Sequence, residues 1–175
     1  MIDQLVYDFD EHCEGGRELL GGKGLCLAEM TSLGLPVPAG FTITTEACRR
    51  HLAHRGPIAP ELRTEIDRHL AALEERTGKR FGDPSDPLLV SVRSGGPVSM
   101  PGMMETILDL GLSDAVIEHA PLHDVRFLLD ADRRLMQLYG EVVARIEPER
   151  FAHELARMRK VHCDPLPLDP LFSLV

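Results

Sequence analysis

Glycine and proline residues divide this chain into short segments, and their positions limit the elements that it can form. Pro36 and Pro38 forbid a helix directly after the apolar repeat that precedes them, and Gly34 is well placed to end that repeat in a left-handed conformation. Further along, Gly78 ends a second helical repeat, and the turn-rich segment 83–87 separates it from the next apolar run. The sequence therefore predicts strands and helices of short to moderate length.

Apolar periodicity places the elements between these breaks. Alternating or continuous apolar residues predict short strands at residues 5–9, 41–43, 88–92 and 107–108. A period of 3.6 residues predicts helices at residues 25–33, 60–77, 125–146 and 148–159, and a further helix toward residue 55 that either Thr44 or Thr45 caps. The helix at 60–77 has one apolar stripe, formed by Leu62, Ile66, Leu70 and Leu73. From this order we expect an α/β (α+β) fold in which a small mixed sheet is followed by helices.

The composition is that of an ordinary folded protein with an acidic surface. Hydrophobic residues make up 43% and charged residues 27% of the 175 residues, and the formal net charge is −9. This length allows one well-buried domain or two small lobes. The negative charge argues against a general nucleic-acid or anionic-membrane surface, so any phosphate ligand must be met by a local group of cations.

The sequence also lacks targeting and membrane signals. No apolar stretch approaches the roughly 18 to 20 residues that cross a bilayer, and the polar N-terminus does not have the pattern of a signal peptide. We therefore expect a cytoplasmic protein with neither nucleic-acid nor membrane partners.

The four cysteines do not form a metal or disulfide pattern. Cys13, Cys26, Cys48 and Cys163 are scattered without a CxxC pair, which favours reduced thiols. Two of them follow a histidine directly, but adjacent His-Cys pairs do not have zinc-ligand spacing. We predict no metal site from these residues.

A glycine cluster with a lysine is the first candidate for a ligand site. In the segment 20–24, Gly22 and its glycine neighbours would let backbone N–H groups approach a phosphate, while Lys23 supplies a mobile positive charge. The spacing is not that of the nucleotide P-loop, because Gly24 follows the lysine where that motif has Ser or Thr. From the spacing alone, a glycine turn with a solvated lysine is an equally open alternative.

An arginine at the end of an apolar run is the second candidate. The run 88–92 has the continuous apolar character of a buried strand, and it ends at Arg93. A guanidinium group offers a planar fork of donors for phosphate oxygens and keeps its charge near neutral pH. The alternative is an ion pair between Arg93 and one of the many carboxylates of the chain.

The loop that follows Arg93 is the third candidate. Residues 95–104 combine glycines, which allow movement, with two prolines and three polarizable methionines. Such a loop could close over a nucleotide and exclude water from the transferring phosphoryl group. We prefer this interpretation to methionine core filling, because three methionines stand beside a glycine-rich hinge.

Other charged residues are weaker candidates. Arg133 and Arg134 lie on a predicted helix, where arginines usually form a solvated or ion-paired face. Glu105 and Asp109 follow the loop, but single carboxylates in such places are more often exposed than chelating. The sequence shows no convincing pair of metal ligands.

Taken together, four segments in this order resemble the start of the pyruvate phosphate dikinase family. They are Gly21-Gly22-Lys23-Gly24, Gly34-Leu35-Pro36-Val37-Pro38-Ala39-Gly40-Phe41, Leu89-Val90-Ser91-Val92-Arg93-Ser94-Gly95 and Ser99-Met100-Pro101-Gly102-Met103-Met104. The similarity covers most of the chain from Leu5 to about Val161. The last segment distinguishes the family from the related phosphoenolpyruvate synthases.

The resemblance implies the first lobe of an ATP-grasp-like nucleotide-binding domain. In it, Lys23 and Arg93 are the catalytic positions that contact ATP phosphates, and Gly22 and Gly95 belong to the same ATP site. The loop covers the polyphosphate through residues that include Ser99, Gly102 and Met103. The implied ligands are ATP and Mg²⁺, with the Mg²⁺ ligands expected mainly from a second lobe. The phosphoryl group then moves toward a phosphohistidine carrier located elsewhere.

Two departures from the family shape the expected function. Family members commonly have Ala-Arg where this chain has Gly96-Pro97, so one arginine near the phosphates is missing and the loop is stiffened. The family also continues for several times this length, so we expect a truncated chain with residues 1–161 as a partial nucleotide-binding domain. Residues 162–175 form a proline-rich tail that we expect to be poorly ordered.

Three functional hypotheses follow from these observations. The first is an ATP-binding, kinase-like domain of a split dikinase, whose remaining domains lie on a second chain. The second is a non-catalytic interaction module that docks through the surface the missing lobe would cover. The third is a remnant without turnover.

Overall fold

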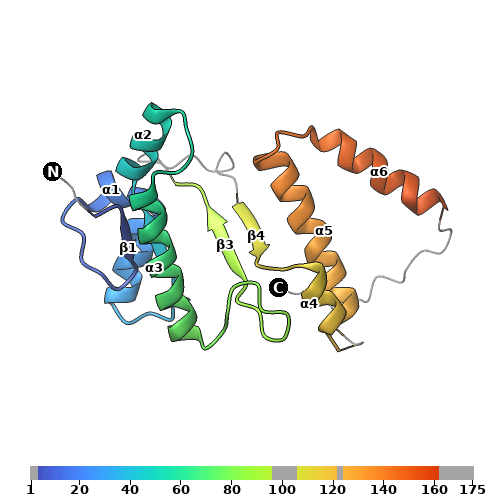
Figure 1. Cartoon of the computed structure of the whole chain (residues 1–175), viewed down its shortest axis with the longest axis horizontal. Helices are drawn as coiled ribbons and strands as arrows, with labels where there is room; N and C mark the ends of the chain where they lie inside the picture. Colours follow the sequence, from blue (N-terminus) through green and yellow to red (C-terminus); the bar gives the residue numbers. More distant parts are fainter. Residues whose placement is uncertain (1–3, 96–105, 122–123, 162–175) are drawn as a thin grey trace.

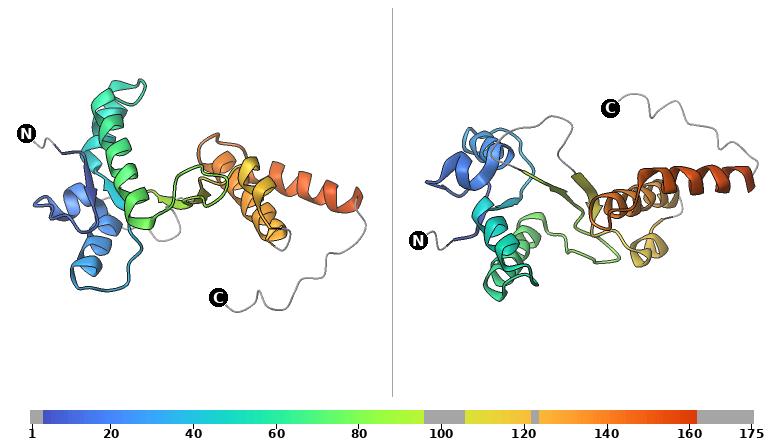
Figure 2. Two further views of the ribbon diagram at one scale, coloured as in Figure 1. Left: turned by 60° about the horizontal axis from the view of Figure 1, so that its bottom comes forward. Right: turned by 90° about the horizontal axis from the view of Figure 1, so that it is seen from above.

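The computed structural model describes residues 4–95, 106–121 and 124–161. Its elements, shown in Figure 1, are β1 (Val6–Asp8), α1 (Gly16–Ser32), β2 (Phe41–Ile43), α2 (Thr45–His54), α3 (Pro60–Thr77), β3 (Val90–Arg93), β4 (Thr106–Leu110), α4 (Asp114–His119), α5 (Val125–Val142) and α6 (Pro148–Val161). The further views in Figure 2 keep β3 and β4 between α1–α3 on one side and α4–α6 on the other. The described chain therefore has two regions joined by a β-hairpin.

The first region is built around a short antiparallel sheet. β1 pairs with β2 so that Val6 lies opposite Ile43. One face of this pair packs against α3, and the core is formed by Leu5, Val6, Ala47 and Leu62, with Phe41 and Ile66 packed against it. Within the stripe predicted for residues 60–77, Leu62 and Leu73 are buried and Ile66 and Leu70 are partly buried, which confirms that prediction.

Three predicted helix ends of this region are confirmed, but α1 begins at Gly16, nine residues before the predicted start at residue 25. Thr44 is the N-cap of α2: its side chain accepts a hydrogen bond from the Ala47 N–H, which resolves the choice between Thr44 and Thr45. Gly34 has a φ of 72° after α1, and the N–H groups of Gly34 and Leu35 bond back to the last turn of the helix. Gly78 closes α3 with a φ of 70°.

The second region is a set of helices beside the hairpin. Leu112, Val116 and Ala131 form its buried core, and α5 packs along β4. α6 follows α5 and approaches it closely at Gly140, where the ring of Phe151 occupies the space of a side chain. The short helix α4 was not predicted from the sequence, because its six residues make fewer than two turns and show no clear apolar period.

The sheet prediction is only partly right. The strands occur close to the predicted positions, but they form two separate antiparallel pairs, β1–β2 and β3–β4, instead of one mixed sheet. Helices α1 to α3 also come between the strands, so the predicted order of a sheet followed by helices is wrong. The physical reason is that each strand pair is covered by its own helices, which leaves two small cores in place of one.

The predicted buried strand at residues 88–92 is another correction. β3 begins at Val90, and Ser91, Val92 and Arg93 are all exposed; only Leu88, before the strand, is buried. Apolar runs predict burial on both faces of a sheet, but β3 has β4 as its one partner among the described strands. The predicted tail at 162–175 lies outside the described residues, and none of the described helices is long and apolar enough to span a membrane.

Candidate phosphate-binding site

The glycine cluster lies inside α1, where it breaks the helix. Gly21 has φ 69° and ψ 175°, a conformation that is almost restricted to glycine, and it divides α1 into two helical parts. In a regular helix, the N–H group of each residue bonds to the carbonyl oxygen four residues earlier. The regular bonds that would cross Gly21 are therefore lost. Gly22, Lys23 and Gly24 therefore begin a new helical turn, whose N–H groups are the usual donors of an anion site.

Lys23 reaches across to the strand that carries the predicted arginine. Its Nζ donates a hydrogen bond of 3.2 Å to the carbonyl oxygen of Ser94, the residue directly after Arg93. The two residues that this bond joins are 71 positions apart in the sequence. The fold therefore brings the lysine of the glycine cluster to the end of β3.

The structure brings together four of the seven predicted site residues. Gly22 and Lys23 lie at the break in α1, and Arg93 and Gly95 flank the serine that Lys23 contacts. The other three, Ser99, Gly102 and Met103, lie outside the described residues, as do Gly96 and Pro97. The prediction that all seven share one site remains a prediction.

Arg93 is exposed, and within the described residues no carboxylate lies within ion-pair distance of its guanidinium group. The alternative of an ion-paired Arg93 thus finds no support in this part of the chain. Arg133 and Arg134, in contrast, both pair with Asp130 at 2.9 Å, as expected for a helix face. These two arginines are engaged locally on α5.

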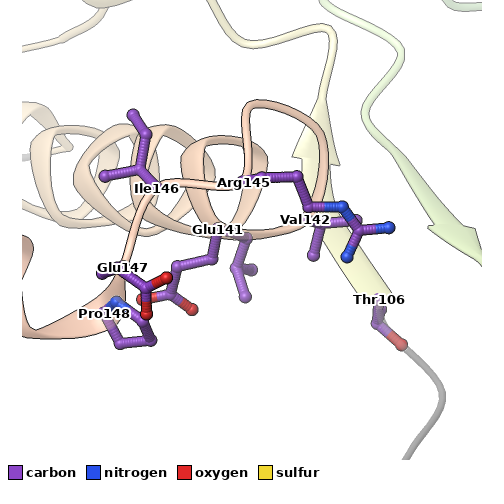
Figure 3. A pocket seen from close by; sticks show the side chains of 8 residues that line it. Thr106, Glu141, Val142, Arg145, Ile146, Glu147 and Pro148 are labelled. Atoms are coloured by element: carbon purple, nitrogen blue, oxygen red, sulfur yellow. The ribbon is translucent and has the colours of Figure 1, made fainter.

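An open cleft of about 400 Å³ begins beside Arg93, on the next strand. Thr106, which pairs with Arg93 across β3 and β4, lines one end of it. The other walls come from the end of α5 and the turn into α6, where Glu141, Arg145 and Glu147 project (Figure 3). Two carboxylates beside one guanidinium group repel a polyphosphate, so we do not assign this cleft to the phosphates.

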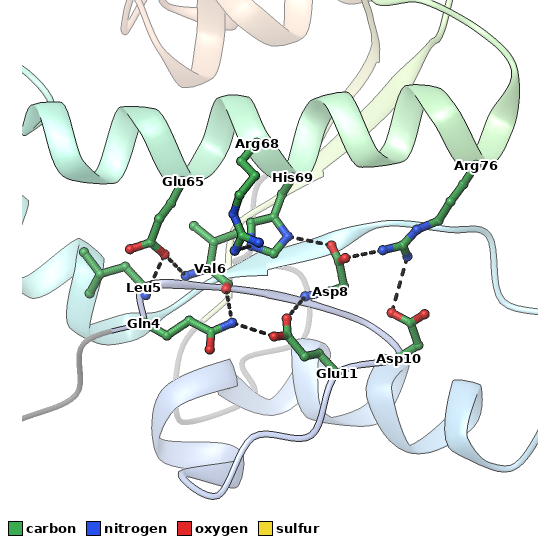
Figure 4. A network of polar contacts seen from close by, with 10 residues as sticks. All are labelled: Gln4, Leu5, Val6, Asp8, Asp10, Glu11, Glu65, Arg68, His69 and Arg76. Carbon is green, nitrogen blue, oxygen red and sulfur yellow. Dashed lines mark hydrogen bonds and ion pairs between the residues drawn. The ribbon is translucent and has the colours of Figure 1, made fainter.

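A polar cluster on β1 and α3 was missed by the sequence reasoning. One ligand-type atom from each of Asp8, Glu11 and His69 lies within 4.8 Å of the others, a spacing that a metal ion could bridge. Figure 4 shows instead a network in which each group already has partners. The Nδ1 atom of His69 is 2.7 Å from Asp8, and its Nε2 atom is 2.9 Å from a nitrogen of Arg68.

This network holds the first region together without a metal. Since a guanidinium group only donates, Nε2 of His69 accepts from Arg68, and Nδ1 carries the proton that it donates to Asp8. Arg76 pairs with the same carboxylate, and two cations at this place repel a metal ion. The one indication of this cluster in the sequence was His69, a polar residue that lies seven positions after Leu62 on the apolar stripe of α3.

The three cysteines in the described part of the chain, Cys13, Cys26 and Cys48, are free, as predicted. Burial, and next the neighbouring Cys13, raises the pKa of Tyr7 above its usual value of 10.0. Tyr7 lies on β1, whereas Cys26 lies on α1, three residues after Lys23.

A lysine at the first turn of a helix, bonded to the residue that follows an exposed arginine, brings together residue types that bind phosphate groups. Residues 17–76, which include the α1 break, match the family model of the pyruvate phosphate dikinase AMP/ATP-binding domain. The chain belongs to the pyruvate phosphate dikinase family.

Similarity to individual dikinases extends beyond that match. The chain is 47% identical over 164 residues to the pyruvate, phosphate dikinase of Clostridium symbiosum, an alignment that covers 91% of this chain and 19% of the relative. The dikinase of Giardia intestinalis is 49% identical over 165 residues, covering 89% and 18%, and that of Rhizobium meliloti (strain 1021) is 50% identical over 143 residues, covering 79% and 16%. The chain thus spans less than a fifth of the length of these relatives.

Proposed function

We propose that this chain binds ATP and that Lys23 and Arg93 contact its phosphates. The observation that carries the proposal is the bond between Lys23 and Ser94, which holds the ammonium group at the end of β3. The match of residues 17–76 to an AMP/ATP-binding domain family supports ATP as the ligand. Residues 1–161 then form a partial nucleotide-binding domain, the first lobe of an ATP-grasp-like domain.

Each site residue has a separate role in this proposal. Lys23 and Arg93 neutralise the charge of the transferring phosphoryl group, which needs electrostatic stabilisation more than covalent help. The N–H group of Gly22 donates to a phosphate oxygen, and Gly95 lets the following loop approach the nucleotide. By resemblance to the family, Ser99, Gly102 and Met103 of that loop cover the polyphosphate.

The described residues do not offer a Mg²⁺ site beside Lys23. The one group of three ligand-type residues in the described ranges, Asp8, Glu11 and His69, is saturated by its own hydrogen bonds and by Arg76. We therefore assign the Mg²⁺ ligands to a second lobe. The same proposal places the phosphohistidine carrier and the remaining dikinase domains on a second chain.

A second candidate function is a non-catalytic interaction module or a remnant without turnover. The observation that favours a module is the apolar surface of α5, where Leu129 and Met136 are 53% and 58% exposed at a spacing of seven residues. Such spacing is typical of a surface that packs on another helix. Co-purification with a chain that bears a second nucleotide lobe, and stronger ATP binding in that complex, would favour the split enzyme over the module.

The proposal includes a location in the cytoplasm. The free thiols of Cys13, Cys26 and Cys48 support it, because such thiols persist in reducing compartments. Fractionation of cells that carry the tagged chain tests this part independently of ligand binding.

Calorimetric titration of the 175-residue chain with Mg-ATP tests the proposed function. Lys23→Ala and Arg93→Ala should each weaken binding by about 1.5 to 3 kcal/mol, the range for a hydrogen bond to a charged group. Lys79→Ala is the matched control, because Lys79 pairs with Asp86 on an exposed loop and should leave affinity unchanged. Equal affinity of the wild type and both site variants would rule the phosphate site out.

A further inference from the structure

The break in α1 has a hydrogen-bond partner that comes from another helix. In an unbroken helix, the carbonyl oxygen of Glu18 would accept the N–H group of Gly22, four residues later. Here Gly21 departs from helical geometry, and the hydroxyl group of Thr45, at the start of α2, donates to the Glu18 carbonyl oxygen. The hydroxyl group therefore competes for the carbonyl oxygen that the Gly22 N–H group would use in a continuous helix.

Thr45 is fixed at this position by the core of the first region. The preceding residue, Thr44, is fully buried, caps α2 through its side chain and donates its own N–H to the carbonyl oxygen of Leu5. β2 ends directly before it, at Ile43, which is paired with Val6 of β1. The position of the Thr45 hydroxyl group is thus set by the sheet and by the helix cap, independently of α1.

The second part of α1 is held by the same corner of the molecule. A Cβ atom on Gly24 would lie 2.9 Å from the side chain of Thr42, so the helix and β2 are in close contact at this glycine. The first part of α1 is tied at Glu18 and the second part at Gly24, on the two sides of Gly21. Both ties come from residues 42–45.

We propose that Thr45 is a positioning residue for the nucleotide site: its hydroxyl group holds the Glu18 carbonyl, keeps the α1 break open and leaves the Gly22 N–H free to bind a phosphate oxygen. This inference rests on the proposed function for its ligand. The existence of the break does not depend on the proposed function, because the break is present in the chain without ATP.

Amide hydrogen exchange of the ¹⁵N-labelled chain without ligand is the first test. In Thr45→Val, which keeps the shape of the side chain but lacks the donor, Gly22 should exchange more slowly than in the wild type because its N–H turns to Glu18. Thr45→Ser should restore fast exchange. Thr64→Val is the matched control, since the Thr64 hydroxyl group bonds to the Pro60 carbonyl oxygen in α3, away from the break.

The exchange of Val6, in the core strand, separates this effect from a general loss of stability, because Val6 should respond only to the stability of the whole region. Unchanged exchange of Gly22 in Thr45→Val would overturn the inference. So would an equal change in Thr45→Val and Thr45→Ser, because the hydroxyl group would then not be the cause.

Affinity for Mg-ATP is the second test. Thr45→Val should weaken binding about three- to tenfold, the effect of one lost hydrogen bond, and Thr45→Ser should bind as the wild type does. Wild-type affinity in Thr45→Val would show that the break does not serve the ligand. If the wild type itself does not bind ATP, the proposed function and the role of Thr45 in nucleotide binding both fail, while the exchange measurement still decides whether Thr45 holds the break.

Discussion

The two regions of the molecule differ in the sequence distance that their polar contacts span. In the first region, Glu65 of α3 accepts the N–H groups of Leu5 and Val6 at 2.9 and 3.0 Å, from about sixty residues away. In the second, Asp130 and Glu154 pair with arginines only three or four positions along the same helix. Long-range contacts fix one tertiary arrangement, whereas local pairs support a helix wherever it lies.

Exposed apolar side chains occur in both regions: Leu33 and Leu52 of the first are 76% and 67% exposed, whereas those of the second are concentrated on and directly after α5. On and directly after α5, the large apolar side chains Phe127, Leu129, Met136, Tyr139 and Val143 are all about half exposed. α6 adds Met158, while its Phe151 contacts α5 at Gly140. The first region thus has the firmer tertiary structure, and it is also the part that matches the nucleotide-binding family. Comparison of matched substitutions in the two regions tests this contrast.

The largest effect is expected from the same substitution made once in each region. Leu62→Ala removes a buried side chain from the first core and should lower the free energy of unfolding by about 2 to 5 kcal/mol. Leu129→Ala, on the exposed face of α5, should change it by less than about 0.5 kcal/mol. Urea unfolding followed by circular dichroism measures both, and similar losses would contradict the contrast.

Removal of the long-range acceptor should have the next largest effect. Glu65→Ala leaves the N–H groups of Leu5 and Val6 without their partner and should cost about 2 to 3 kcal/mol. Glu154→Ala removes an exposed partner of Arg157 and should leave the urea midpoint unchanged. If the two variants unfold at the same urea concentration, the sequence distance that a contact spans does not determine its contribution to stability.

The break in α1 gives a smaller effect that is local to the first region. Gly21→Ala places a Cβ atom at a φ of 69° and ψ of 175° and should destabilise the chain by about 1 to 3 kcal/mol. Gly22→Ala is the neighbouring control for stability, because a Cβ atom there meets nothing within 4 Å. Thermal unfolding compares the two variants. Equal melting temperatures would mean that a side chain at position 21 causes no backbone strain.

The smallest expected effect is a pH dependence in β1. Burial, followed by the charge and hydrogen bond of Cys13, raises the pKa of Tyr7 above 10.0, so the folded chain keeps a proton that the unfolded chain loses. This contribution to stability is present below pH 10.0 and is lost as the pH rises through the folded pKa. Tyr7→Phe should flatten the alkaline part of a stability–pH curve, and an unchanged slope would show that other groups cause it.

Much of the secondary structure could be predicted from local sequence. Thr44, Gly34 and Gly78 end or begin helices through chemistry that each residue carries by itself. The site was predicted less completely, because glycines have low helix propensity and the cluster at 21–24 was therefore interpreted as a turn before a helix. The contact between Lys23 and Ser94 joins residues that no local pattern relates.

The sequence by itself determined where most helices and strands lie, the residue types of the candidate site and, through its ordered motifs, the resemblance to the dikinase family. Tertiary structure alone decided that the strands form two separate pairs, that β3 is exposed and that α1 stays broken. The reason is physical: caps and apolar periods act within a few residues, whereas the break is held by Thr42 and Thr45 from β2 and α2. Such contacts exist only once the chain has folded.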